Sequence, residues 1–120
     1  MALPELRRRG DHWLLVGGPV PPRADAMTIG PVVSVRRAQA GNERLLTHEG
    51  VHVRQWRELG WVGFPRRYLG AYLSLRWAGF GHRAAYRLIP LEAEAEAVAR
   101  GEGRPPPAVG EPLAGRSPHR

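Results

Sequence analysis

The chain contains no cysteine and no lysine, and it has no long run of apolar residues. Without cysteine it can form no disulfide framework, no thiolate zinc finger and no cysteine nucleophile. The best candidate for a membrane span, residues 59–80, is broken by Arg66, Arg67 and Arg76, whereas a span needs about 18 uninterrupted apolar residues. Residues 1–9 are charged and no apolar stretch follows them, so we expect no secretory signal. These absences predict a small soluble protein, located in the cytoplasm.

The lack of lysine leaves arginine to supply all 18 basic residues, which face 11 acidic ones and give a formal net charge of +7. Such a balance is typical of proteins that bind nucleic acid or acidic surfaces. The arginines are scattered along the chain, however, and a complete absence of lysine indicates a coding bias across the whole genome. We therefore expect no specific nucleic-acid partner, and a basic nucleic-acid-associated protein is the least favoured alternative.

A chain of 120 residues is long enough for one domain. Residues 101–120 hold five prolines and four glycines and almost no large apolar side chain. Such a segment buries too little surface to offset the entropy lost on ordering it. We predict a folded, metal-binding domain over residues 1–100 and a flexible tail over residues 101–120. Whether the tail inhibits the domain stays open.

The spacing of apolar residues predicts two strands followed by three helices. The expected strands cover residues 12–16 and 26–37, and the expected helices cover residues 42–60, 65–77 and 90–100. Pro31 cannot donate a hydrogen bond within a sheet, so it places the second strand at an edge or at a bulge. Strands before helices favour an α+β fold, in which a small antiparallel edge sheet packs on about three helices.

An HExxH motif occupies residues 48–52 on the first expected helix. Four residues of helix rotate by about 400°, so His48 and His52 lie one turn apart on the same face and can share one metal ion. Glu49 is displaced by about 100°, which lets its carboxylate reach a water on that metal. The alternative is that both histidines are core residues with other partners. Their position on a regular helical period favours the metal site.

A catalytic zinc ion usually has three protein ligands. The metzincin pattern HExxHxxGxxH does not apply, because Gln55 holds the glycine position and Glu58 holds the position of the third histidine. The other common arrangement takes a glutamate from a later helix, for which Glu92 is the natural candidate. The alternative for Glu92 is an exposed, charged helix face, as alanine–glutamate segments often form.

Taken together, these segments resemble a very small gluzincin, a zinc metallopeptidase with HExxH on one helix and a glutamate ligand on a later one. The resemblance covers about residues 28–98. The sequence is most similar to compact bacterial zincin-like proteins. These have an HExxHxxQ segment, here residues 48–55, and a Tyr-x-x-Asn-Pro-x-Glu-x-Glu-Ala segment, here residues 86–95. Two positions depart from the pattern. Ile89 replaces the asparagine, and Glu96 replaces an aspartate that braces a ligand histidine, a bond that glutamate can also accept.

The resemblance implies a minimal zincin-like domain and a zinc-dependent metallopeptidase, with a peptide or protein as substrate. It implies that His48, His52 and Glu92 bind Zn²⁺ and that Glu49 acts as the general base. A strand within residues 26–37 could hold an extended peptide by backbone pairing, or it could simply cover the helix. The alternative is a catalytically silent zinc-binding scaffold or protein-interaction domain, which the small size of the chain favours.

Stabilisation of a developing oxyanion needs a hydrogen-bond donor. Tyr86 and His82 precede the glutamate helix and are candidates for this role, although both could be structural. Gln55 could line the cleft or be ordinary polar filling. The helix over residues 65–77 places Tyr68 on an apolar stripe, and it carries more large aromatic side chains than a small core accommodates. A homodimer and a peripheral contact with a membrane therefore both stay open.

Overall fold

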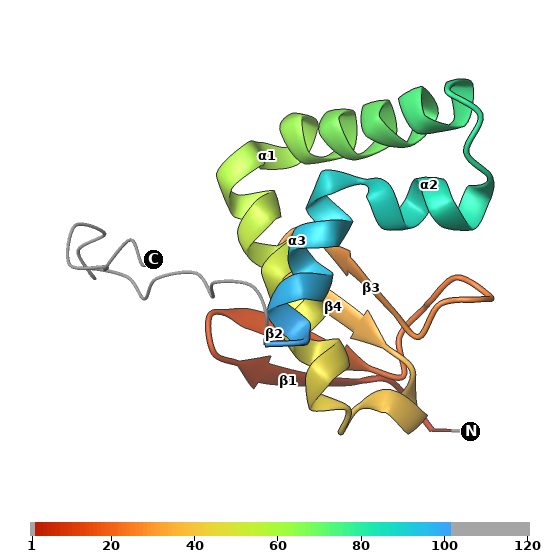
Figure 1. The fold of residues 1–120 in the computed structure, drawn as a ribbon. Coiled ribbons are helices and arrows are strands. Elements are labelled where there is room, and N and C mark those ends of the chain that lie inside the picture. Colours follow the sequence, from red (N-terminus) through yellow and green to blue (C-terminus); the bar gives the residue numbers. More distant parts are fainter. Residues whose placement is uncertain (1, 102–120) are drawn as a thin grey trace.

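The computed structural model describes residues 2–101, in which a small sheet packs against one long helix and two short ones (Figure 1). The strands are β1 (Glu5–Arg9), β2 (His12–Val16), β3 (Ala26–Ile29) and β4 (Val32–Val35). The helices are α1 (Glu43–Trp77), α2 (His82–Leu88) and α3 (Pro90–Ala99), and a single 3-10 turn precedes α1. The predicted α+β fold is confirmed. Except for Gly101, the predicted flexible tail lies outside the described residues, so the division into domain and tail stays a prediction.

The sheet is mixed, with the strand order β1-β2-β4-β3. Strands β1 and β2 are antiparallel, as are β3 and β4, but β2 and β4 run parallel. The prediction of a purely antiparallel sheet is therefore wrong at its centre. The reason is the connection over residues 17–25, which carries the chain past the position of β4 and leaves β3 at the outer edge.

The strand predicted over residues 12–16 is confirmed as β2, whereas the rest of the sheet differs from the prediction. The second expected strand is divided into β3 and β4 by a turn at Gly30 and Pro31. Gly30 has a φ of +58°, and a Cβ atom there would come within 2.5 Å of the Trp61 ring, so glycine suits both the turn and the packing. Strand β1 was not predicted, because four of its five residues are charged and its ordering depends on pairing with β2.

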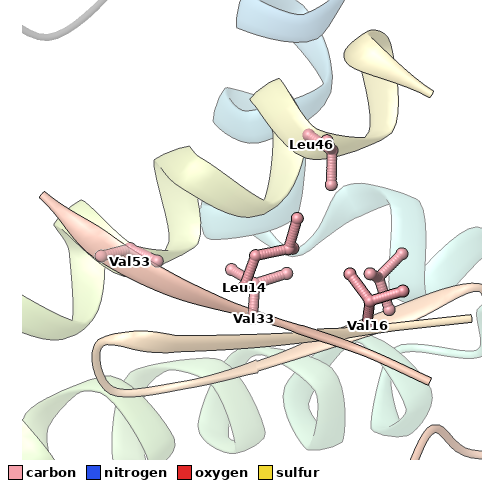
Figure 2. Packing of buried hydrophobic residues seen from close by; sticks show 6 residues of the cluster. Leu14, Val16, Val33, Leu46 and Val53 are labelled. Atoms are coloured by element: carbon pink, nitrogen blue, oxygen red, sulfur yellow. The ribbon is translucent and has the colours of Figure 1, made fainter. Parts of the chain in front are cut away.

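The core lies between the inner face of β2 and β4 and the first half of α1. It consists of six buried aliphatic side chains: Leu14, Val16, Val33, Val35, Leu46 and Val53. Figure 2 labels all of these except Val35. Leu46 and Val53 are seven residues apart, which is two helical turns, so they face the sheet together. This packing fixes the orientation of the helix that carries the HExxH motif.

Helix α1 begins where the sequence predicts, because the Asn42 side chain accepts a hydrogen bond from the backbone N–H of Leu45 at 3.1 Å. The predicted helices over residues 42–60 and 65–77 are joined into one element that bends at Gly60, where φ is 83° and ψ is 175°. Beyond the bend, α1 leaves the sheet and runs beside α2 (Figure 1). Helix α2 was not predicted. Within residues 2–101, no helix combines the length and hydrophobicity that a bilayer span requires.

Candidate metal centre

Two elements position the candidate ligands. His48, Glu49 and His52 lie on the first half of α1, and Glu92 lies in the first turn of α3. Proline at the first position of α3 fixes where that helix begins, since its missing N–H would have no partner there. The fully buried Ala95 lets α3 approach α1 closely. Glu92 is thereby directed at the two histidines.

One carboxylate oxygen of Glu92 lies next to both imidazoles. Its Oε1 is 2.9 Å from His48 Nε2 and 3.2 Å from His52 Nε2. The two rings are roughly perpendicular, with centroids 5.0 Å apart. Glu92 and His52 are buried, with 6% and 5% of their surface exposed. The structure thus brings together the three residues that the sequence proposes as ligands.

Gln55 determines which nitrogen of His52 carries the proton. The Gln55 amide Nε2 donates to the Leu91 carbonyl at 3.0 Å and to Glu94 Oε1 at 2.7 Å. Its Oε1 therefore accepts, and it lies 2.8 Å from His52 Nδ1, which must be the donor. In neutral imidazole the lone pair is then on Nε2. In neutral His52 this buried atom has no hydrogen-bond partner among residues 2–101, although Glu92 Oε1 lies 3.2 Å away and can accept from it once the ring is protonated.

Glu96 is the corresponding neighbour of His48. Its Oε1 lies 3.2 Å from His48 Nδ1, while Glu92 Oε1 lies 2.9 Å from His48 Nε2, so each ring nitrogen faces a carboxylate and a neutral ring can donate to only one of them. When Nδ1 donates to Glu96, the lone pair of neutral His48 is on Nε2 and points at Glu92. Arg44 holds Glu96 in place through an ion pair of 2.5 Å. The bracing contact expected of Glu96 is therefore present, despite the longer side chain.

These contacts allow a test of whether the site fits a metal. Two lone pairs and a carboxylate oxygen converge, and they repel one another unless a cation lies between them or both imidazoles take a second proton. Tetrahedral zinc with bonds of about 2.0–2.2 Å places its ligand atoms about 3.3–3.6 Å apart. The distances of 2.9 and 3.2 Å from Glu92 to the two nitrogens are close to that spacing. The donor set of two nitrogens and one oxygen suits Zn²⁺.

The charges of the neighbouring groups favour an ionised Glu92, which can bind a cation. Burial acts to raise the pKa of Glu92, but the bonds to His48 and His52 outweigh it and hold that pKa well below its usual range. Burial acts to lower the pKa of His52, but the bond to Glu92 and its charge outweigh burial and raise it. Glu92 is therefore an ionised carboxylate, and a proton on His52 is the natural competitor of a metal.

Glu49 is a second buried carboxylate beside the histidines. One ligand atom from each of His48, Glu49 and His52 lies within 4.8 Å of the others. Thr28 on β3 donates from Oγ1 to Glu49 Oε1 at 2.6 Å, whereas Glu49 Oε2 has no hydrogen-bond partner among residues 2–101. Because only Glu92 has an oxygen within 3.2 Å of both Nε2 atoms, Glu92 is the better candidate ligand. Glu49 has an oxygen free for proton transfer.

Tyr68 belongs to the site, although the sequence assigned it only to an apolar stripe. Its hydroxyl donates to Glu92 Oε2 at 2.5 Å. Burial, and then the negative charge of Glu92, raise the pKa of both Tyr68 and Tyr86, so both phenols keep their protons. Tyr86 lines the same hollow as Glu49 and Glu92. His82 lies farther out, where its Nδ1 is 2.9 Å from the Tyr72 hydroxyl.

Of the hollows that border the site, two lie along β3. The larger, of about 720 Å³, reaches His48 and Glu49 and is bordered by Arg23, Arg44 and Arg83. The smaller, of about 300 Å³, reaches His52 and Glu92 and has mainly apolar walls. Both are lined by Ala26 of the edge strand β3, by Glu49 and by Tyr86. An extended ligand along β3 would therefore pass the candidate metal site.

No protein-family model, no curated protein and no solved structure matches this chain. The gluzincin resemblance and the roles that it implies stay predictions. What the structure adds is the convergence of His48, His52 and Glu92, which depends on no comparison with other proteins.

Proposed function

We propose that this chain is a zinc-dependent peptidase, with His48, His52 and Glu92 as its metal ligands. The observation that carries the proposal is the convergence of two imidazole nitrogens on one buried, ionised carboxylate oxygen, at 2.9 and 3.2 Å. A bound zinc ion supplies a Lewis acid that polarises a carbonyl and lowers the pKa of water toward about 7.

Glu49 is the proposed general base. Thr28 occupies its Oε1 and fixes the carboxylate, which leaves Oε2 to take a proton from water and to pass it to the leaving amine. Its place at the junction of the two hollows supports this role, because a substrate bond in either hollow lies near it. A purely structural metal site has no need of a second carboxylate in that position.

The proposed substrate is a peptide or a protein segment in extended conformation. Strand β3 is at the sheet edge, so one side of its backbone has no strand partner within residues 2–101 and can pair with a peptide. Tyr86 is the better candidate to donate a hydrogen bond to the developing oxyanion, because it lines both hollows. His82 is the weaker one, since Tyr72 engages its ring. The cytoplasmic location stays a prediction from the absence of cysteine.

The test is cleavage of a mixed peptide library by the zinc-loaded chain and by its Glu49→Gln variant, read out by mass spectrometry. Glutamine keeps the size and the Thr28 contact but cannot act as a base, so cleavage should fall by about 10²–10⁴-fold. Zinc content and melting temperature should stay unchanged. Glu58→Gln, a change at an exposed position on the same helix, is the matched control and should cleave normally.

Equal cleavage by the Glu49→Gln variant would contradict the proposed peptidase mechanism. If the zinc-loaded parent cleaves no peptide in the library, the zinc-binding scaffold becomes the better description of the chain.

A further inference from the structure

A continuous third of the described chain carries only positive charge. Residues 59–91 contain no aspartate and no glutamate, but they contain five arginines: Arg66, Arg67, Arg76, Arg83 and Arg87. This segment forms the second half of α1, the link to α2 and α2 itself. In Figure 1 its first part lies on the side of α2 away from the sheet. This segment is therefore basic, and no acidic residue within it balances its arginines.

The same segment exposes large apolar side chains on one face of α1. Val62, Leu69 and Leu73 are 75%, 56% and 56% exposed, and their spacing of seven and four residues places them on one side of the helix. Trp77, at the end of this half of α1, is 93% exposed. The helix thus has an exposed aliphatic stripe that ends at a tryptophan.

The other face of this half-helix is already occupied. Phe64 is buried and stacks on Trp56 with ring centroids 4.4 Å apart, and Tyr68 reaches Glu92. The exposed stripe is therefore an additional apolar face and not the core face of the helix. It lies on the opposite side of α1 from the candidate metal centre.

The arginines of this segment are free to meet an external partner. Within residues 2–101, Arg66, Arg67, Arg83 and Arg87 have no ion-pair or hydrogen-bond partner, and Arg76 contacts only the Tyr72 hydroxyl at 3.1 Å. On the first half of α1, by contrast, the arginines pair with acidic residues: Arg44 with Glu96, Arg54 with Glu94 and Arg57 with Asp11.

We propose that this surface, formed by Val62, Arg66, Leu69, Leu73, Arg76 and Trp77, docks on an anionic lipid membrane. Tryptophan is favoured at the boundary between headgroups and acyl chains, aliphatic side chains enter just below it, and arginines attract anionic headgroups. The helix would lie in the plane of the membrane surface. This proposal is independent of the peptidase proposal, because it uses none of the metal-centre residues.

Two other occupants fit the surface less well. A second copy packed by two-fold symmetry would bring Arg66 and Arg76 toward the same arginines of its partner, with no acidic residue of the segment to separate them. A nucleic acid would satisfy the arginines, but it would leave the aliphatic stripe of Val62, Leu69 and Leu73 without an apolar partner.

The experiment is co-sedimentation of the full chain with phosphatidylcholine vesicles that contain either no anionic lipid or about 30% phosphatidylserine. One variant, Leu69→Glu with Leu73→Glu, makes the stripe acidic. A second variant changes Arg66 and Arg76 to glutamine. The matched control is Leu6→Glu, because Leu6 is 57% exposed, as Leu69 and Leu73 are, but lies on β1. Circular dichroism verifies that each variant is folded.

We expect the parent and Leu6→Glu to sediment with the anionic vesicles and to be released by high salt. Each arginine at an anionic surface contributes about five-fold to partitioning, so the double glutamine variant should bind roughly 25-fold more weakly. The double glutamate variant should lose binding at least as strongly.

Three results would overturn the proposal. The parent could fail to bind anionic vesicles at low salt, or Leu6→Glu could lose as much binding as the double glutamate variant. The surface could also turn out to hold a different partner. That would be the case if the parent formed a dimer or bound an oligonucleotide, and the double glutamate variant lost that property but still bound vesicles.

Discussion

The first half of α1 is packed against the rest of the protein, whereas the second half is largely exposed on one face. Before Gly60, the polar side chains that face inward are buried and have partners, as His52, Gln55 and Glu49 show. After Gly60, large apolar side chains such as Leu73 and Trp77 are exposed. One continuous helix thus combines a half directed at the core and the candidate metal centre with a half directed at solvent.

The bend at Gly60 explains the difference. The first half packs on β3 and β4, whereas the second half leaves the sheet and has α2 beside it (Figure 1). A short helix of seven residues with one buried side chain, Ala85, covers only part of its neighbour. The apolar side chains on the far face of α1 therefore have no cover within the described residues. The sequence of α1 thus specifies a first half that packs on the core and a second half whose far face is exposed.

The largest expected effect is on stability, from a leucine in each half. Leu46 is 3% exposed and belongs to the core, whereas Leu73 is 56% exposed. Leu46→Ala should lower the free energy of unfolding by about 2–5 kcal/mol through lost burial and a new cavity. Leu73→Ala should change it by less than about 0.5 kcal/mol. Urea unfolding of both variants measures the difference, and equal losses would show that both halves are core elements.

An intermediate effect is expected on zinc affinity. Glu96→Ala removes the carboxylate that accepts from His48 Nδ1, which should weaken zinc binding by about 10–100-fold. Competition with a zinc-chelating dye measures the affinity, and Glu58→Ala is the control, since among residues 2–101 Glu58 pairs only with Arg54, at 3.5 Å. If the two variants bind zinc equally, Glu96 does not orient His48.

The smallest expected effect is on the free energy of unfolding, when an arginine that forms an ion pair or one that does not is replaced. Arg57 of the first half forms an exposed ion pair with Asp11 at 2.7 Å, whereas Arg67 of the second half has no partner among residues 2–101. Arg57→Ala should lower the free energy of unfolding by about 0–1 kcal/mol, and Arg67→Ala should leave it unchanged. Thermal unfolding at low and high salt tests this. A larger loss for Arg67→Ala would reveal a structural role on the exposed face.

The parts of the fold that local sequence determines could be predicted. The start of α1 follows from the Asn42 cap and the apolar period after it, and the start of α3 follows from Pro90. The direction of the central strand pair could not be predicted. It depends on whether β3 or β4 of a hairpin pairs with β2, and nothing within either strand decides that choice.

For the candidate site, sequence spacing predicts the shared helix face of His48 and His52, but their meeting with Glu92 depends on how α3 packs on α1. Tyr68 had no signal that could have revealed its contact with Glu92. That contact requires the bend at Gly60, whereas the helical period treats Tyr68 as one more member of an apolar stripe.

The central claim is that His48, His52 and Glu92 bind one zinc ion. The most direct measurement is the zinc content per chain, by mass spectrometry of metals, after loading with zinc and removal of the excess. The parent and Glu49→Gln should each retain about one zinc ion, and His48→Ala should retain almost none. A parent that retains no zinc, or a folded His48→Ala variant that retains as much as the parent, would contradict the assignment of these ligands.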